Sequence, residues 1–210
     1  MTTSKPMLVY IVDSDPALRE TVCTLLESVG LQVCALADLN AFLDVYQPRQ
    51  PGCLLLDILT PGRGELSALQ VLADKGINLP VIVVTQHGNV ATAVTVMKQG
   101  AMDFIEKPFN DQVLLDCVHN ALAEDAVRRR ARARRRIIQR RFETLTPREQ
   151  EVLKQVAEGL SNRQIADSLN LSRKTVEVHR AKVMQKMEAE TLSQLIRMAM
   201  LMGVLKTYDD

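Results

Sequence analysis

Four polar side chains that could bind or accept a phosphoryl group end or follow four stretches of the sequence that predict strands. The stretches are residues 7–12, 53–56, 79–84 and 102–106, and the polar residues are Asp13, Asp57, Thr85 and Lys107. The run 53–56 shows no polar–apolar alternation, which predicts a strand buried on both faces, as in a parallel sheet. Since the carboxyl ends of parallel strands meet at one edge of a sheet, the four side chains should converge there.

This set of groups favours transfer of a phosphoryl group to an aspartate. A carboxylate such as Asp57 can attack phosphorus and hold the group as an acyl phosphate. A divalent metal bound to carboxylates and the ammonium group of Lys107 would reduce the charge repulsion that opposes this attack. Thr85 could then hydrogen-bond the new phosphate. The alternative, a solvated loop aspartate, is disfavoured by the other three groups.

The segments between the strands predict helices. Asp15 can cap a helix that has Pro16 in its first turn and stops at Gly30. A strand at 31–36, a loop at Pro61, Gly62 and Gly64, and helices near 38–46, 66–75 and 89–99 complete this part. The alternation predicts right-handed βαβ units and a doubly wound α/β domain with a five-stranded parallel sheet.

Charge divides the chain into two parts. Residues 1–125 contain 7 Lys and Arg against 15 Asp and Glu, whereas residues 126–210 contain 19 against 10. A basic carboxyl-terminal half suits a polyanion such as nucleic acid. Aromatic residues make up only 3% and Trp is absent, so base stacking is not expected. We predict domains at 1–122 and 144–210, joined by a linker at 123–143.

Targeting signals are missing from the sequence. The amino terminus turns polar too soon for a signal peptide, and no apolar run reaches the ~18 residues of a membrane-spanning helix. The four cysteines lack C-x-x-C spacing and predict buried free thiols. We therefore expect a cytoplasmic protein without a membrane partner.

The linker carries nine Arg within residues 128–141. One long helix is predicted from Asp111 to about Arg141, because Ala and Arg favour helix. Like charges four residues apart oppose it, so its stability should be frayed. Two interpretations remain open, a solvated charged spacer and a segment that contacts DNA phosphates.

Three helix starts in residues 144–210 share the S/T-x-x-E/Q pattern of a capping box, at Thr146, Ser161 and Thr191. A short break at residues 170–172 separates helices at 161–169 and 173–187, which predicts a helix-turn-helix within an all-α, four-helix domain.

The helix at 173–187 should have two different faces. Val176, Val183 and Met187 are spaced for burial, and the residues expected to meet the major groove lie opposite or beside that face. These are Lys174, Thr175, Glu177, Val178, Ala181, Lys182 and Gln185. Arg180 lies near the buried seam, which favours a phosphate or an intradomain contact over base reading.

Residues 7–122 resemble the receiver domain of bacterial two-component response regulators, which has a flavodoxin-like fold. The matching segments are IVDSDPALR, LLLDILTPG, VIVVTQHG and DFIEKPF. The resemblance implies that Asp57 is the phospho-acceptor, Thr85 the switch hydroxyl, Lys107 the phosphate-pairing lysine and Phe104 the rotating aromatic residue.

The metal pocket departs from the family pattern. Asp13 and Asp57 match Mg²⁺ ligands, but Ser14 stands where the family has a second acid, and Glu65 replaces a usual glycine. Asp15 could help to bind the metal, although Pro16 suggests that it is occupied as a helix cap. Weak Mg²⁺ binding is the expectation that follows.

Residues 144–205 resemble the helix-turn-helix of FixJ/NarL-type (LuxR-type) regulators, through LTPREQEVL, GLSNRQIADSL and LSRKTVEVHRAKVMQKM. The two resemblances imply a response regulator rather than an enzyme. A histidine kinase would phosphorylate Asp57, and a homodimer would then bind DNA and activate transcription, with RNA polymerase as a further partner. The rivals are a Mg-dependent phosphotransferase and a DNA-binding regulator whose receiver works without phosphate.

Overall fold

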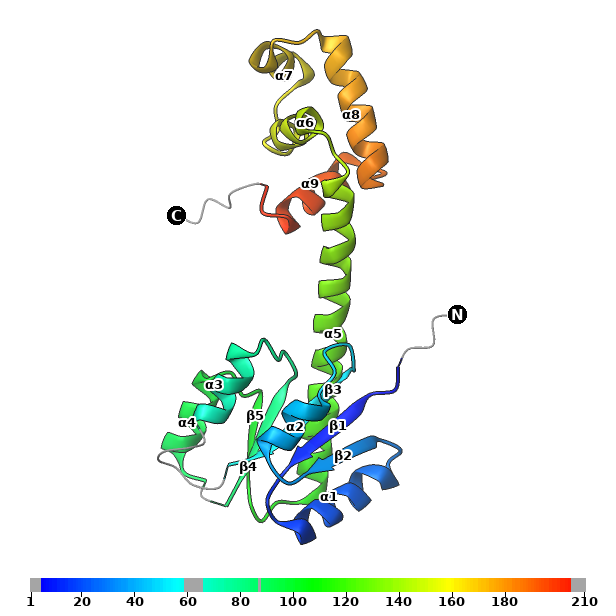
Figure 1. Ribbon diagram of the computed structural model, residues 1–210. Coiled ribbons are helices and arrows are strands. Elements are labelled where there is room, and N and C mark those ends of the chain that lie inside the picture. Colours follow the sequence, from blue (N-terminus) through cyan, green and yellow to red (C-terminus); the bar gives the residue numbers. More distant parts are fainter. Residues whose placement is uncertain (1–4, 59–65, 87, 205–210) are drawn as a thin grey trace. The chain divides into compact units, whose positions relative to one another are not determined.

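The computed structural model describes residues 5–58, 66–86 and 88–204 (Figure 1). The chain divides into two compact units, Met1–Arg129 and Arg130–Asp210, and each is described by itself. The predicted loop at Pro61, Gly62 and Gly64, and the substitution at Glu65, lie outside the described residues. Within the described residues, no helix is long and apolar enough to cross a membrane.

A parallel sheet forms the centre of the first unit, in the order β2-β1-β3-β4-β5. Its strands are β1 (Leu8–Val12), β2 (Gln32–Leu36), β3 (Gly52–Asp57), β4 (Val81–Thr85) and β5 (Asp103–Glu106). In the register of the two central pairings, Val12 lies beside Leu56 and Asp57 lies beside Val84. The unbroken apolar sequences of β3 and β4 are buried along almost their whole length, as expected for strands covered on both faces. The predicted doubly wound α/β fold is confirmed.

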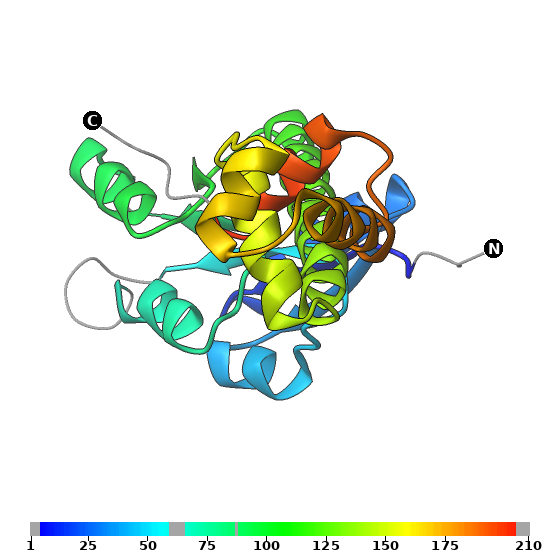
Figure 2. The ribbon, with the colours of Figure 1, turned by 90° about the horizontal axis from the view of Figure 1, so that it is seen from above.

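Helices cover both faces of this sheet. They are α1 (Pro16–Ser28), α2 (Leu39–Val45), α3 (Leu66–Asp74), α4 (Val90–Lys98) and α5 (Asp111–Glu143). Val22 of α1 and Leu114 of α5 share a core with the same face of the sheet. Phe42 of α2 and Val96 of α4 belong to the core on the opposite face. The helices α2 and α3 lie side by side on that face in Figures 1 and 2.

Side-chain caps begin the helices α1 and α4, and the cap of α1 is the one that the sequence predicts. The Asp15 carboxylate accepts hydrogen bonds from the backbone N–H groups of Ala17 and Leu18, with Pro16 in the first turn. Asn89 caps α4 in the same way through the N–H of Thr92. Such caps satisfy donors that the first helical turn leaves without a backbone partner.

The first unit extends into the linker helix through a buried carboxylate. Asp125 is 1% exposed, and its Oδ2 accepts from the Gly52 N–H at 2.9 Å and from Arg129 Nε at 2.5 Å. Arg129 also donates to the carbonyls of Pro48 and Gln50. The compact unit therefore runs to Arg129, while the functional boundary at residue 122 stays a prediction.

The linker is helical throughout the described chain. The helix α5 continues without interruption through the arginine-rich residues to Glu143. The low stability of this helix remains a prediction, because it concerns the free energy of helix formation. The boundary between the two compact units falls inside this helix.

The second unit is all helical. After the end of α5 it contains α6 (Pro147–Ala157), α7 (Asn162–Leu169), α8 (Arg173–Met187) and α9 (Leu192–Leu201). The core includes Ile138 of α5, Leu153 of α6, Ile165 of α7, Val183 of α8 and Leu195 of α9. Thr146 and Ser161 form the complete capping boxes that their sequences predict.

Candidate functional site

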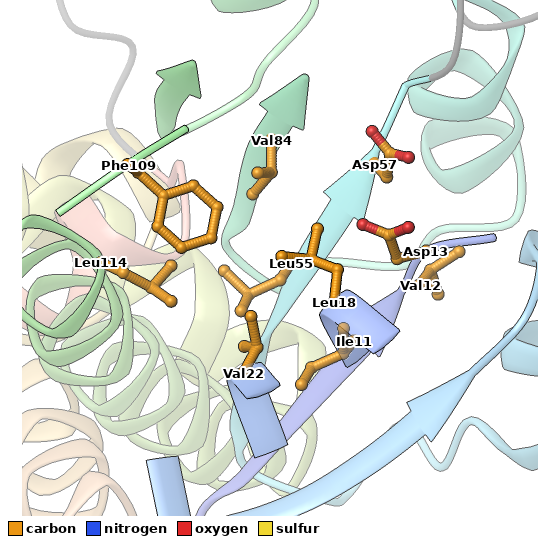
Figure 3. Close-up of a pocket in the computed structure, with 10 residues that line it drawn as sticks. All are labelled: Ile11, Val12, Asp13, Leu18, Val22, Leu55, Asp57, Val84, Phe109 and Leu114. Carbon is orange, nitrogen blue, oxygen red and sulfur yellow. The ribbon is translucent and has the colours of Figure 1, made fainter. Parts of the chain in front are cut away.

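The carboxyl edge of the sheet brings together the four predicted polar side chains. Asp57 and Thr85 are the last residues of β3 and β4, while Asp13 and Lys107 directly follow β1 and β5. These strands are consecutive in the sheet, so their carboxyl ends are neighbours. In Figure 3 the carboxylates of Asp13 and Asp57 lie close together above an apolar floor.

Lys107 links the two carboxylates. Its Nζ lies 2.7 Å from Asp13 Oδ2 and 3.1 Å from Asp57 Oδ1. The three side chains are each at most 8% exposed. One buried ammonium group can neutralise only one of the two buried carboxylates. With both carboxylates ionised, the cluster of three side chains therefore has a net negative charge.

Burial and the neighbouring charges both shift the pKa of Asp57. Burial raises the pKa of the Asp57 carboxyl, and the adjacent Asp13 carboxylate raises it further. The hydrogen bond and positive charge of Lys107 act in the opposite direction but do not outweigh them. An aspartate with a raised pKa and little solvation is a candidate functional group.

Asp13 is held by the loop that leads into α1. Its Oδ1 accepts from the Asp15 N–H at 2.8 Å, and its backbone carbonyl accepts from the Arg19 guanidinium at 2.5 Å. Asp15 itself points to the α1 backbone as a cap, as predicted, and is exposed. The Arg19 contact was not predicted, because a bond to a backbone carbonyl has no signature in the sequence.

Thr85 lies at the same edge, at the end of β4, whereas Phe104 is the second residue of β5 and lies beside Val83 of β4. The Thr85 side chain is buried, and its hydroxyl donates to the Ile58 carbonyl at 3.0 Å. Phe104, in β5, is half-buried and packs against the core that contains α4. Thr85 is therefore on the strand next to β3, which ends at Asp57, and Phe104 is one strand farther out.

The donor set fits a divalent metal only in part. Mg²⁺ is commonly held by one or two carboxylates together with water and phosphate oxygens, and Asp13 with Asp57 supplies two carboxylates. No cluster of three His, Cys, Asp or Glu suited to a metal occurs among residues 5–58, 66–86 and 88–204. Ser14 is exposed beside them and adds no charge.

A small cavity lies beneath the two carboxylates (Figure 3). It has a volume of about 10 Å³, room for about one water molecule. Apart from Asp13 and Asp57 its lining is apolar, and includes Leu18, Val84 and Phe109. This floor removes water from one side of Asp57, in keeping with its raised pKa.

The second candidate site is the turn between α7 and α8. The last residue before the turn, Asn170, has φ 52°, the left-handed conformation that Asn tolerates at a helix end. Ser172 then caps α8 by accepting from the Thr175 N–H at 3.0 Å, and the two hydroxyls are 2.8 Å apart. Two short helices thus meet across a tight turn, as predicted.

The two faces of α8 are divided as the sequence predicts. Val176, Val183 and Met187 are buried in the core of the unit. The opposite and flanking positions are exposed, apart from a half-buried Thr175: Lys174, Glu177, Val178, Ala181, Lys182 and Gln185. An exposed face of mixed polar and small apolar residues is accessible to another molecule.

Arg180 makes an intradomain contact. Its guanidinium donates to Asn162 Oδ1, the side chain at the start of α7, at 2.5 Å. The contact fixes α8 against α7 at the turn, so Arg180 is half-buried rather than directed to solvent. Nothing in the sequence singled out Asn162 as its partner.

A buried carboxylate supports the other end of α8. Glu149 is 3% exposed and completes the Thr146 capping box. Its Oε2 also lies 2.6 Å from Lys186 Nζ on α8. Sequence reasoning recognised the cap but missed the ion pair, because the capping pattern does not show which cation lies across the core.

Comparison with known proteins identifies both units. Residues 9–119 match the family described as response regulator receiver domain. Residues 143–199 match the family described as bacterial regulatory proteins, luxR family.

Relatives align over nearly the whole chain. Nodulation protein W of Bradyrhizobium diazoefficiens is 41% identical over 96% of this chain and 88% of its own length. The transcriptional regulatory protein FixJ of Azorhizobium caulinodans is 42% identical over 96% of this chain and 95% of its own. The solved structure of the response regulator StyR has a TM-score of 0.80 at 37% identity, covering 93% of this chain and 98% of StyR.

The convergent carboxylates, the helix-turn-helix and the matches across both units lead to one assignment. The chain belongs to the response regulator family, with a receiver domain and a LuxR-type DNA-binding domain.

Proposed function

We propose that this response regulator is switched by phosphorylation of Asp57 by a histidine kinase. The observation that carries the proposal is the buried Asp13–Lys107–Asp57 cluster at the carboxyl edge of the sheet. Asp57 would attack the phosphorus of the kinase's phosphohistidine, so that an acyl phosphate forms while the P–N bond breaks and the kinase histidine leaves. Lys107, which now pairs with both carboxylates, would then pair with a phosphate oxygen, since an ammonium group stabilises the charge that develops there.

Thr85 and Phe104 would transmit the change. Thr85 lies at the end of the neighbouring strand, where its hydroxyl could exchange the Ile58 carbonyl for a phosphate oxygen. Movement of Thr85 toward Asp57 would leave space for Phe104 to rotate inward. The half-buried position of Phe104 supports this role, because a ring in that position has room on one side.

Mg²⁺ would be held by Asp13 and Asp57, where it would neutralise phosphate charge during transfer. The hydrogen bond from the Asp15 N–H would keep the Asp13 carboxylate oriented, and the Arg19 guanidinium would hold the Asp13 backbone in place. Asp15 would contribute less, since its carboxylate caps α1. Lys107 would have to yield part of its contact with both carboxylates, which weakens binding.

The Ser14→Asp variant should bind Mg²⁺ more tightly than the wild type, because a third carboxylate adds charge and an oxygen ligand. Titration calorimetry of the two proteins measures the difference. Ser14→Asn is the matched control, with similar shape and no charge. Equal affinities for Asp and Asn at position 14 would contradict the two-carboxylate site.

We infer that phosphorylation favours a homodimer. The helix α4 exposes three apolar residues at helical spacing, Val90, Val94 and Met97. This helix packs beside β5, the strand that contains Phe104. A rotation of Phe104 would therefore change the surface at which a second copy could bind.

In the DNA-binding unit, α8 would enter the major groove. Lys174, Val178, Ala181 and Gln185 would face base edges, and Thr175, Glu177 and Lys182 would flank them. The exposure of this face supports the proposal, since the opposite face is committed to the core. Arg180 would act through Asn162 by holding α8 in place. A dimer would carry two such helices and read a two-fold site near a promoter.

Replacement of Gln185 by Ala should change base preference by roughly 1–3 kcal/mol at one position, the size of one good side-chain contact to a base. Selection of bound duplexes from a random pool, before and after the change, measures the preference. Lys182→Ala is the comparison, and it should weaken all sequences alike. A uniform loss from the Gln185 change would remove this residue from the base-reading face.

The protein would be a cytoplasmic activator of transcription that works with DNA, its kinase and RNA polymerase. The same random-pool selection, with acetyl phosphate and Mg²⁺ added or withheld, tests whether phosphorylation controls DNA binding. Tighter selective binding after phosphorylation is expected. Identical binding in both states would favour the alternative, a DNA-binding regulator whose receiver acts without phosphate, which the missing acid at Ser14 would explain.

A further inference from the structure

Six arginines of the linker helix have no acidic partner within the described chain. These linker arginines are Arg130, Arg132, Arg134, Arg135, Arg136 and Arg140. All six are exposed, and their side chains make no hydrogen bond or ion pair with any residue that the structure describes. Arg128, Arg129 and Arg141 differ, because they pair with Glu124, Asp125 and Glu188.

The linker arginines repel one another. The sequence has no Asp or Glu from residue 126 to residue 142. Arg132, Arg136 and Arg140 are four residues apart, a spacing at which like charges destabilise a helix. The helix nevertheless continues through them. A polyanion would remove this repulsion when it binds.

Three of them form a stripe directed away from the protein core. At 100° and 1.5 Å per residue, Arg132, Arg136 and Arg140 project from one side of α5 at intervals of about 6 Å. Ile138 projects from the opposite side and is buried in the core of the second unit. The stripe therefore faces solvent, where a ligand can reach it.

The stripe begins next to the helix that we propose reads DNA. Arg141 donates to the Met187 carbonyl and pairs with Glu188, at the carboxyl end of α8. Lys186 donates to the Thr144 carbonyl at 3.2 Å, close to the end of α5. The end of α5 is thus fixed to α8, and binding of α8 would hold Arg140 and Arg136 at high local concentration near the duplex.

Charge and helix pattern favour DNA over a lipid surface. A helix that lies on a membrane needs a broad apolar face. Here the arginines project from several sides of the helix. In the described segment from Arg130 to Arg140, only Ile137 is a large exposed apolar residue. Guanidinium groups pair with phosphate oxygens in fork geometry, so a sugar–phosphate backbone suits them.

We propose that the linker arginines contact backbone phosphates of the DNA that flanks the site read by α8. This inference rests on the proposed DNA-binding function and adds a second, sequence-independent contact to it. Phosphate contacts strengthen binding without selecting bases, and they make it depend on salt.

The test compares the full-length triple variants R132Q/R136Q/R140Q and R132K/R136K/R140K with the wild type. The probe is a mixed-sequence DNA duplex, and affinity is measured over about 50 to 200 mM salt. The Gln variant should flatten the plot of log affinity against log salt by about 0.9 for each phosphate that the protein no longer neutralises. The Lys variant keeps the charges and should keep the slope. Gln and Lys resemble Arg in helix propensity, and circular dichroism checks that α5 is retained.

The outcomes separate this inference from the function beneath it. An unchanged slope in the Gln variant, with DNA binding intact, would overturn the linker contact and leave the linker as a charged spacer. Absence of wild-type binding to any duplex would overturn both proposals. Vesicles of phosphatidylserine and phosphatidylcholine form the last arm. Arginine-dependent vesicle binding with an unchanged DNA slope would replace DNA by lipid as the partner.

Discussion

Replacement of Asp57 by Asn should abolish labelling of the protein by acetyl phosphate. An amide is not a nucleophile toward phosphorus, whereas the shape of the side chain and its place at the end of β3 are retained. A phosphate-affinity gel run with and without Mg²⁺ measures the labelled fraction. Asp103→Asn is a matched control, since Asp103 also lies in the receiver but takes part in no step of the proposed phosphoryl transfer. Labelling of Asp57→Asn at the wild-type rate would place the acceptor elsewhere.

The same variant should be more stable than the wild type at neutral pH. The folded-state pKa of Asp57 is raised, mainly by burial and then by Asp13. A carboxyl group with a raised pKa stabilises the fold while protonated and penalises it once ionised. The difference in melting temperature should therefore be largest above the folded-state pKa and should close as pH falls toward ~3.9, the ordinary value. A constant difference at all pH values would contradict this cause.

The sheet could be predicted because its strands are buried on both faces. Apolar runs that end in a charged or hydroxyl residue predict both the strands and the edge where Asp13, Asp57, Thr85 and Lys107 meet. The observed strand ends differ from the predicted ones by one or two residues. For example, β4 starts at Val81 rather than at residue 79. Backbone pairing defines such ends, and side-chain hydrophobicity only approximates it.

Side-chain contacts to the backbone outside the helix caps could not be predicted. Arg19 donates to the Asp13 carbonyl, and Asp125 accepts from the Gly52 N–H, across 73 positions of sequence. Every residue offers the same backbone groups, so only the folded chain selects the partner. Gly52 is required there for a related reason, because a Cβ would lie 1.9 Å from the Leu8 carbonyl oxygen.

Local patterns in the second unit predicted helix starts better than side-chain partners. Thr191 caps α9 through the Gln194 N–H, but Gln194 Oε1 accepts from the Glu190 N–H instead of completing the predicted box. On the same helix, Met198 is buried whereas Met200 is exposed. Both are Met, so composition does not distinguish them and only helix packing decides.

Replacement of Glu149 by Ala should destabilise the DNA-binding unit by roughly 3 kcal/mol. The change removes two charge-assisted contacts, to the Thr146 N–H at 2.9 Å and to Lys186 at 2.6 Å. It also leaves the Lys186 ammonium group without the carboxylate that neutralises its charge. Lys186 is one-third exposed, so water recovers part of the loss and the cost stays at the lower end for buried pairs.

A matched control uses the exposed pair on the same helix. Glu151 pairs with Arg148 at 2.6 Å, with both side chains more than one-third exposed. Glu151→Ala should change the free energy of unfolding by less than about 1 kcal/mol, because exposed pairs contribute little. Denaturant unfolding of the two variants measures the contrast. Equal effects at positions 149 and 151 would contradict a structural role for the buried carboxylate.

The pH dependence identifies the source of this stability. Burial raises the pKa of Glu149, but the hydrogen bonds from Lys186 and Thr146 and the charge of Lys186 outweigh it, so the pKa is lowered overall. A lowered carboxyl pKa stabilises the fold above the unfolded value of ~4.3, and that stability is lost as pH falls through the folded-state pKa. Glu149→Gln keeps the side-chain length and can still accept from Thr146, but it does not titrate. The wild type should therefore lose its stability advantage over Glu149→Gln as the medium is acidified. The DNA binding that we propose for α8 should weaken as well, because Lys186 fixes that helix through Glu149.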